Sequence, residues 1–130
     1  MKNISPLVSI GICIFRVEYL RSLFKKLEDQ TYLQIEFIFS IDNPSDNIIE
    51  LVNNFNLKDK KNIKIFINKV PLGAIRNHNF CLSKATGEYF IRIDDDDEPH
   101  DKYYIENLVN HAAKGYDFVL PRVDVVNGNK

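Results

Sequence analysis

Short apolar segments alternate along this chain with segments whose apolar residues recur three, four and seven positions apart. The short segments are rich in isoleucine, valine and phenylalanine, which is typical of buried strands. They predict five strands, at Leu7–Phe15, Glu36–Ile41, Ile63–Ile67, Glu88–Ile93 and Tyr116–Leu120. The segments of helical period predict four helices, at Glu18–Gln30, from Ser45 to Phe55, from the loop Asn68–Gly73 to about Ala85, and from Pro99 to Gly115.

Strands that alternate with helices of this length indicate βαβ units. The predicted fold is α/β, a Rossmann-like, mostly parallel sheet with helices on both faces. Ser45 suits the N-terminal cap of the second helix and Gly87 the C-terminal cap of the third. Ligands of such sheets bind beyond the carboxyl ends of the strands, so we expect the chemistry in the loops after the first, second and fourth strands.

The last residues predict a chain that stops within its domain. Val123–Val126 predicts a further strand, and Asn127-Gly128 after it is the strongest short hairpin signal. Only Asn129 and Lys130 follow, so the returning strand is missing. We therefore expect residues 1–130 to form a single, truncated domain, with an exposed sheet edge through which a homodimer can form.

Length and composition exclude several classes of protein. The chain has 130 residues, 45% of them hydrophobic and 27% charged, which is typical of one globular domain and not of a disordered or coiled-coil protein. Its formal net charge of -1 lacks the basic surplus that nucleic-acid binding requires, so we expect no nucleic-acid partner. Cys13 and Cys81 lie in apolar stretches without a CxxC pattern, which predicts buried free thiols and favours a reducing, cytoplasmic compartment.

An unbroken acidic run, Asp94–Glu98, directly follows the fourth predicted strand. Asp94 and Asp96 are two positions apart, so in extended backbone both carboxylates point the same way. Together they can hold a hard divalent cation such as Mg²⁺ or Mn²⁺ and leave positions open for the phosphates of a ligand. A solvated acidic loop is one alternative, and the metal site of an unrelated α/β phosphotransferase or hydrolase is another. His78 has no metal-ligand spacing and is expected to be a structural residue of its helix.

Five segments, in this order and at these spacings, carry motifs that cover almost the whole chain. They are Val8–Arg16, Gln30–Tyr32, Ile41–Asp46, Leu72–Asn77 and Gly87–Asp97. Together they resemble the family 2 glycosyltransferases of the GT-A fold, whose opening strand is often VSIGICTYK and whose acidic motif is often GEYIxFLDADD. The resemblance implies a GT-A three-layer sandwich, of which this chain is the nucleotide-sugar-binding, or donor, half, and from which the acceptor-binding half is absent.

The resemblance also implies roles for individual residues. Asp42 matches an acidic residue of the loop that reads the base, and Arg76 matches an arginine near the donor pyrophosphate. Phe15 stands where the family has tyrosine, so contacts with the base are expected through its backbone. The complete set is Asp42, Arg76, Asp94 and Phe15 for the nucleotide sugar, and Asp96, Asp94 and Asp97 for Mg²⁺ or Mn²⁺.

The function implied by this resemblance is metal-assisted transfer of a sugar, with inversion, from a nucleoside-diphosphate sugar to an acceptor hydroxyl. A UDP-sugar is the first expectation for the donor. The expected acceptor is a glycan or a lipid-linked molecule, as in polysaccharide, lipopolysaccharide or capsule synthesis, in the cytoplasm or at the inner face of the cell membrane. The general base is expected outside this chain, so a non-catalytic nucleotide- or metal-binding fragment of the same fold stays an alternative.

Overall fold

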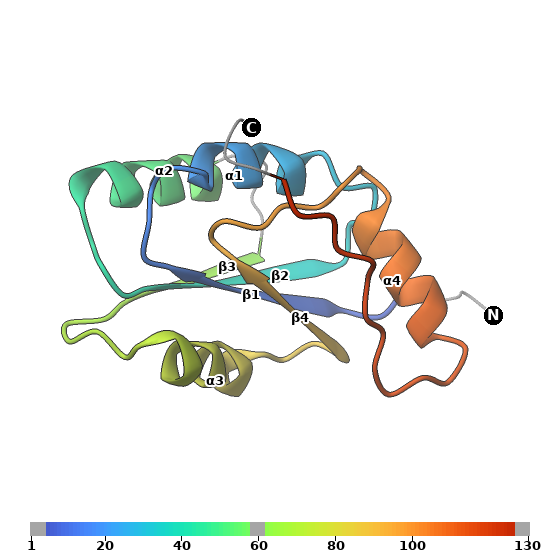
Figure 1. The fold of residues 1–130 in the computed structure, drawn as a ribbon. Helices are drawn as coiled ribbons and strands as arrows, with labels where there is room; N and C mark the ends of the chain where they lie inside the picture. Colours follow the sequence, from blue (N-terminus) through green and yellow to red (C-terminus); the bar gives the residue numbers. More distant parts are fainter. Residues whose placement is uncertain (1–4, 58–61, 127–130) are drawn as a thin grey trace.

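The computed structural model describes residues 5–57 and 62–126. Strands and helices alternate along the chain (Figure 1). They are β1 (Val8–Ile14), α1 (Leu20–Glu28), β2 (Ile35–Ile41), α2 (Asp46–Leu57), β3 (Asn62–Ile67), α3 (Ala74–Lys84), β4 (Tyr89–Asp94) and α4 (Tyr104–Ala112). The four strands are parallel and lie in the order β3-β2-β1-β4. The predicted α/β architecture is thereby confirmed.

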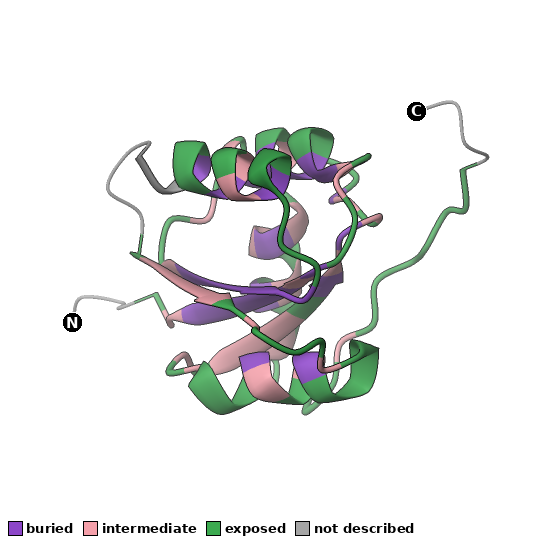
Figure 2. Ribbon diagram, turned by 90° about the vertical axis from the view of Figure 1, so that its left-hand side faces the viewer, coloured by how far each residue is buried: buried purple, intermediate pink, exposed green. Residues whose placement is uncertain are grey.

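Helices cover both faces of the sheet, with α1 and α2 on one side and α3 on the other (Figure 1). Side chains of a strand alternate between these sides, and the alternate residues of β1 that face α1 and α2 are apolar. The main core lies on that side, and α4 adds Ile105 and Val109 to it. Figure 2 shows the buried residues concentrated in the central strands and on the inward sides of the helices. None of the described helices has the length and apolarity needed to cross a bilayer.

Four phenylalanines form the centre of the main core. The ring centroids of Phe24 in α1 and Phe55 in α2 are 4.8 Å apart, and Phe39 of β2 lies 5.3 Å from the first and 5.4 Å from the second. Phe37 contacts both Phe39 and Phe55. Because each buried ring contributes about 2–3 kcal/mol, this packing holds α1 and α2 on the sheet.

On the side of the sheet that faces α3, the central strand is small and polar by contrast, whereas β3 contributes Phe66, which packs against Phe80 of α3. β1 presents Ser9, Gly11 and Cys13 to this side. A Cβ atom at Gly11 would lie 2.9 Å from the Cβ atom of Cys81 in α3 and 2.6 Å from the ring of Phe90. Glycine at this position therefore lets α3 approach the central strand more closely than a larger residue would.

The buried carboxylate of Glu36 ties three elements together at the amino end of the sheet. Its side chain accepts hydrogen bonds from the Ser9 hydroxyl at 2.5 Å and from the Thr86 amide and hydroxyl at 2.5 and 2.8 Å. The Lys64 ammonium lies 3.2 Å from its second oxygen. Burial by itself raises the pKa of Glu36, but the donors from Ser9, Thr86 and Lys64 outweigh it and lower the pKa to about 2.

The two strands predicted near the C-terminal end are wrong. Tyr116–Leu120 and Val123–Val126 are irregular in the described structure. A strand needs a partner for its backbone groups, and neither segment joins the sheet beside β4. Phe118 and Val125 accordingly expose 88% and 90% of their surface, and Figure 2 shows this end of the chain running clear of the sheet. The Asn127-Gly128 turn lies outside the described residues.

The predicted helix end at Ser45 is correct, and those at Gly87 and Gly115 are wrong. The Ser45 hydroxyl accepts a hydrogen bond from the first turn of α2, as expected for a cap. Gly115, with a φ of 97°, lies three residues beyond the end of α4, because the helix covers only Tyr104–Ala112 of the segment predicted from Pro99 to Gly115. Gly87 does not cap α3, because the helix ends earlier, with Ala85 in extended conformation. Gly87 packs against β1 instead, where a Cβ atom would come within 2.6 Å of the Ser9 hydroxyl.

We expect Glu36→Gln to lower the free energy of unfolding at neutral pH by about 3 kcal/mol, because the charge that its donors stabilise is lost. The pKa in the folded chain lies below the ordinary value of 4.5, so this contribution is present above pH 4.5 and disappears as the pH falls towards 2. Urea denaturation at a series of pH values measures it. Glu50→Gln, on the exposed surface of α2, is the matched control. Equal losses in the two variants would contradict the assignment.

Candidate functional site

The carboxyl ends of β1, β2 and β4 lie at one edge of the sheet, because these strands are parallel and adjacent. The loops that leave this edge begin with Phe15 after β1, Asp42 after β2 and Asp95 after β4. The residues predicted to carry chemistry from these three loops are thus gathered at one edge of the molecule. Arg76 belongs to the first turn of α3 instead.

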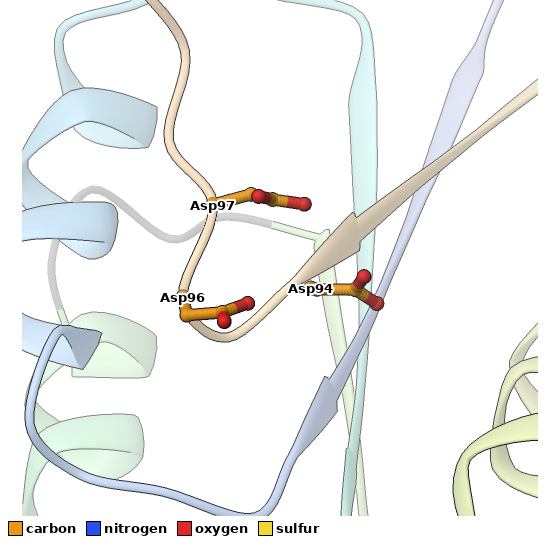
Figure 3. A group of neighbouring side chains, drawn as sticks. All are labelled: Asp94, Asp96 and Asp97. Atoms are coloured by element: carbon orange, nitrogen blue, oxygen red, sulfur yellow. The ribbon is translucent and has the colours of Figure 1, made fainter. Parts of the chain in front are cut away.

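Three carboxylates of the acidic run form a cluster. Asp94 is the last residue of β4, and a tight turn follows in which the Asp97 amide donates to the Asp94 carbonyl at 3.1 Å. One oxygen from each of Asp94, Asp96 and Asp97 lies within 4.8 Å of the others. Figure 3 shows Asp96 and Asp97 extending from the turn towards the side on which Asp94 lies. Carboxylate oxygens are the ligands that Mg²⁺ and Mn²⁺ prefer, so this donor set suits a hard divalent cation.

Asp95 points away from this cluster and into the protein. It is only 4% exposed, and one of its oxygens accepts hydrogen bonds from the amides of Phe15 and Arg16 at 2.8 and 2.7 Å. The sequence pattern assigned no role to this residue. Its inward direction is set by the turn that follows β4, because Asp95 lies beyond the last residue of the strand, so strand alternation did not predict it.

Arg16 joins the buried acid to the cluster. Its Nη2 lies 2.9 Å from Asp95 Oδ1 and 3.0 Å from Asp96 Oδ2. The hydrogen bond and the charge of Asp95 raise the pKa of Arg16 further above its already high value. A permanent positive charge therefore stands beside the carboxylate cluster, on a side chain that is about half exposed.

His78 of α3 contacts Asp94 of the cluster. Its Nε2 lies 2.8 Å from Asp94 Oδ1, and its Nδ1 lies 3.0 Å from the Cys13 sulfur in β1. Arg92 also donates to Asp94, at 3.2 Å. The expectation of a purely structural His78 missed the first of these contacts, because the pairing of α3 with the end of β4 is a tertiary feature.

Asp42 is buried and organises the loop between β3 and α3. It accepts hydrogen bonds from the Asn68 side chain at 2.8 Å and from the amides of Leu72 and Gly73 at 3.0 and 2.9 Å. Gly73, with a φ of 77°, is the residue that precedes α3. Asp42 therefore shapes the entry to α3, and it lies outside the carboxylate cluster.

The other two predicted nucleotide residues present their side chains to solvent. Phe15 is 56% exposed, and both of its backbone polar groups are already bonded, the amide to Asp95 and the carbonyl to the Asn43 side chain. Arg76 lies on the exposed surface of α3. Neither belongs to the carboxylate cluster.

Comparison with known proteins assigns this arrangement to a family. Residues 9–130 match the family described as glycosyl transferase family 2. The chain belongs to this family. The resemblance inferred from the five motif segments is thereby confirmed, and the match extends over the sheet, the carboxylate cluster and the C-terminal segment of this glycosyltransferase-family chain.

Curated relatives agree with the family assignment. The chain is 34% identical over 110 residues to an uncharacterized glycosyltransferase of Haemophilus influenzae, a match that covers 84% of the chain and 33% of the relative. It is 34% identical over 117 residues to the GalNAc(5)-diNAcBac-PP-undecaprenol beta-1,3-glucosyltransferase of Campylobacter jejuni, covering 88% of the chain and 37% of the relative. The family 2 chain thus spans about a third of the length of the curated relatives it matches.

Solved structures of glycosyltransferases share the fold. A mannosyltransferase from Pyrobaculum calidifontis, in complex with GDP-Man and Mn²⁺, superposes with a TM-score of 0.73 at 16% identity over 82% of this chain and 32% of its own. TarS from S. aureus, in complex with UDP-GlcNAc, gives a TM-score of 0.72 at 20% identity over 83% of this chain and 31% of its own. These neighbours confirm the predicted GT-A type of fold.

We expect Asp95→Asn to loosen the loop after β1, because an amide cannot accept from both backbone amides and pair with the Arg16 guanidinium as the carboxylate does. The loss should lower the free energy of unfolding by about 2 kcal/mol and speed hydrogen exchange at the Phe15 and Arg16 amides. Denaturant titration and exchange followed by NMR measure the two effects. Asp117→Asn, at an exposed position, is the control with the same change of charge. Unchanged protection of both amides would contradict the role of Asp95.

Proposed function

We propose that this chain binds the donor substrate of a glycosyltransferase, a nucleoside-diphosphate sugar together with Mg²⁺ or Mn²⁺. The observation that carries the proposal is the cluster of Asp94, Asp96 and Asp97 at the carboxyl end of a parallel sheet in a family 2 chain. Two neighbours of the same fold support it, since one holds GDP-Man and Mn²⁺ and the other UDP-GlcNAc. In this proposal, residues 1–130 are one domain and form the donor part of the enzyme.

The carboxylates would hold the cation, and their surroundings prepare them for it. Asp94, which His78 orients through a contact of 2.8 Å, would supply one ligand. Asp96, next to Arg16, and Asp97 would supply the others. When bound, the cation would neutralise the negative charge that develops on the departing diphosphate. Arg16 places a further positive charge on the same side and so would favour phosphate oxygens there.

Three more residues are proposed to contact the nucleotide. A carboxylate accepts about four hydrogen bonds, and Asp42 uses three of them for its own loop, so one position remains for a donor of the base. Phe15 offers its exposed ring at the end of β1, because its backbone groups are already bonded. Arg76 is proposed to pair with the diphosphate, for which the guanidinium fork is suited.

The proposed reaction is an in-line displacement at the anomeric carbon. The oxygen of an acceptor hydroxyl forms the new bond on the face opposite the diphosphate, the bond to the diphosphate oxygen breaks, and the configuration inverts. A general base must take the hydroxyl proton, and we assign it to no residue of this chain. We propose a UDP-sugar as donor and a glycan or lipid-linked acceptor, in surface polysaccharide synthesis on the cytoplasmic side of the membrane.

We expect the 130-residue chain to bind one of UDP, GDP or dTDP in the presence of Mn²⁺ and to lose most of that affinity when the metal is chelated. Asp96→Asn should weaken the Mn²⁺-dependent binding by at least about tenfold, because one charged ligand of the cation is lost. Calorimetric titration of each nucleotide, with and without Mn²⁺, measures both effects.

Asp117→Asn is the matched control for this experiment, because it removes one exposed negative charge outside the cluster. If a nucleotide binds equally strongly with and without metal, the proposed role of the cation is rejected and the proposed binding of the nucleotide is retained. No binding of any of the three nucleotides would reject the proposed function.

We expect Arg76→Gln to weaken binding of UDP by roughly tenfold while leaving binding of uridine unchanged, because the guanidinium is proposed to pair with the diphosphate only. Arg21→Gln, at an exposed position of α1, is the matched control. Calorimetric titration with UDP and with uridine measures both variants. An equal loss of affinity for UDP and for uridine would show that Arg76 does not act on the phosphates.

A further inference from the structure

Both cysteines of the chain lie in contact with each other beneath α3. The Cys13 sulfur of β1 and the Cys81 sulfur of α3 are 3.9 Å apart, although the two residues are 68 positions apart in the sequence. Gly11 makes this approach possible, since a Cβ atom at that position would lie 2.9 Å from the Cβ atom of Cys81. Neither thiol belongs to the carboxylate cluster, and the proposed transfer reaction uses neither of them.

We propose that Cys13 and Cys81 are a reversible thiol pair that closes into a disulfide on reaction with a hydroperoxide. The sulfur atoms would need to move from 3.9 Å to the bonded distance of about 2.05 Å. The movement is about 2 Å, because the sulfurs are already in contact across the interface between α3 and β1. Cys81 is fully buried, whereas Cys13 is partly exposed and is the sulfur that an oxidant in solution can reach.

The contact between the two thiols decides which sulfur of the pair carries a negative charge. The contact with Cys81, together with burial, raises the pKa of Cys13, and the same contact lowers the pKa of Cys81. The first negative charge of the pair therefore lies on the buried Cys81. A proton must pass from Cys13 to Cys81 before the partly exposed Cys13 becomes the thiolate, which is the nucleophilic form.

The atoms and electrons of the proposed step balance. The Cys13 thiolate attacks one oxygen of the hydroperoxide, the O–O bond breaks, and a sulfenic acid forms on Cys13 as hydroxide or alkoxide leaves with a proton from solvent. The Cys81 thiol then attacks the Cys13 sulfur, and water leaves as the S–S bond forms. The two thiols together lose two electrons and two protons, and the peroxide is reduced to water, or to an alcohol and water.

The pair is connected to the carboxylate cluster by a single residue. The Cys13 sulfur lies 3.0 Å from His78 Nδ1, and the other ring nitrogen of His78 lies 2.8 Å from Asp94. Closing the disulfide would draw the Cys13 sulfur towards Cys81 and take its proton from the contact with His78. A change in cation binding on oxidation would follow, and this consequence alone rests on the proposed function.

The experiment follows the thiols without metal or nucleotide, so its outcome does not depend on the proposed function. The reduced 130-residue chain is titrated with hydrogen peroxide in the presence of a chelator, then unfolded and alkylated with N-ethylmaleimide. We expect both alkylation sites to be lost together, a decrease in mass by two hydrogen atoms, and recovery of both sites with dithiothreitol. A digest without reductant should yield one cross-linked product that contains Cys13 and Cys81.

Two variants sharpen the test. In Cys81→Ser, Cys13 should be trapped by dimedone as a sulfenic acid, because the second thiol is missing. In Cys13→Ser, the buried Cys81 should resist the same dose of peroxide. Retention of both thiols in the wild-type chain at a dose that oxidises free glutathione would overturn the proposal, as would disulfides that form only between chains. The wild-type measurement decides the matter even where a variant fails to fold.

Discussion

The buried carboxylate of Asp95 is the interaction on which the site depends. It joins the end of β4 to the loop after β1, because its oxygens receive the amides of Phe15 and Arg16 and the Arg16 guanidinium. Since this side chain points inward, its neighbours Asp94 and Asp96 turn outward and meet. The bonds form when the chain folds, so the order they impose on the loop is already present before any ligand arrives.

The two sides of the sheet differ in the kind of contact that stabilises them. The side facing α1 and α2 is filled by isoleucine, leucine and phenylalanine, and its contribution is nonspecific burial. The side facing α3 carries the Glu36 network, the thiol pair, His78 and the loop organised by Asp42. α3 is held there through its close approach to Gly11, through hydrogen bonds and through the edge-to-face contact of Phe66 with Phe80. Changes on this side are therefore expected to act through specific polar contacts, as at Glu36.

Much of the fold could be predicted from the sequence, because its signals are local. The strands and helices up to α4 follow from apolar periodicity, and the acidic run directly after β4 indicated the position of the cluster. The two C-terminal strands were wrong because a strand requires a partner that periodicity does not supply. The inward direction of Asp95 depends on the turn that follows β4, and the contact between Cys13 and Cys81 depends on how closely α3 approaches β1 at Gly11. These features arise from tertiary packing, which a motif along the chain does not encode.

Arg16 gives the cluster an internal counter-ion, and this changes the thermodynamic meaning of any cation affinity measured there. Its guanidinium lies 3.0 Å from Asp96. A divalent ion that binds this carboxylate would therefore have to replace the ion pair between Asp96 and Arg16. The observed binding constant would then report the difference in free energy between two ion pairs of Asp96, one with Arg16 and one with the cation. The internal ion pair would lower the observed affinity for the cation and so ease its release, which suits the proposed donor site.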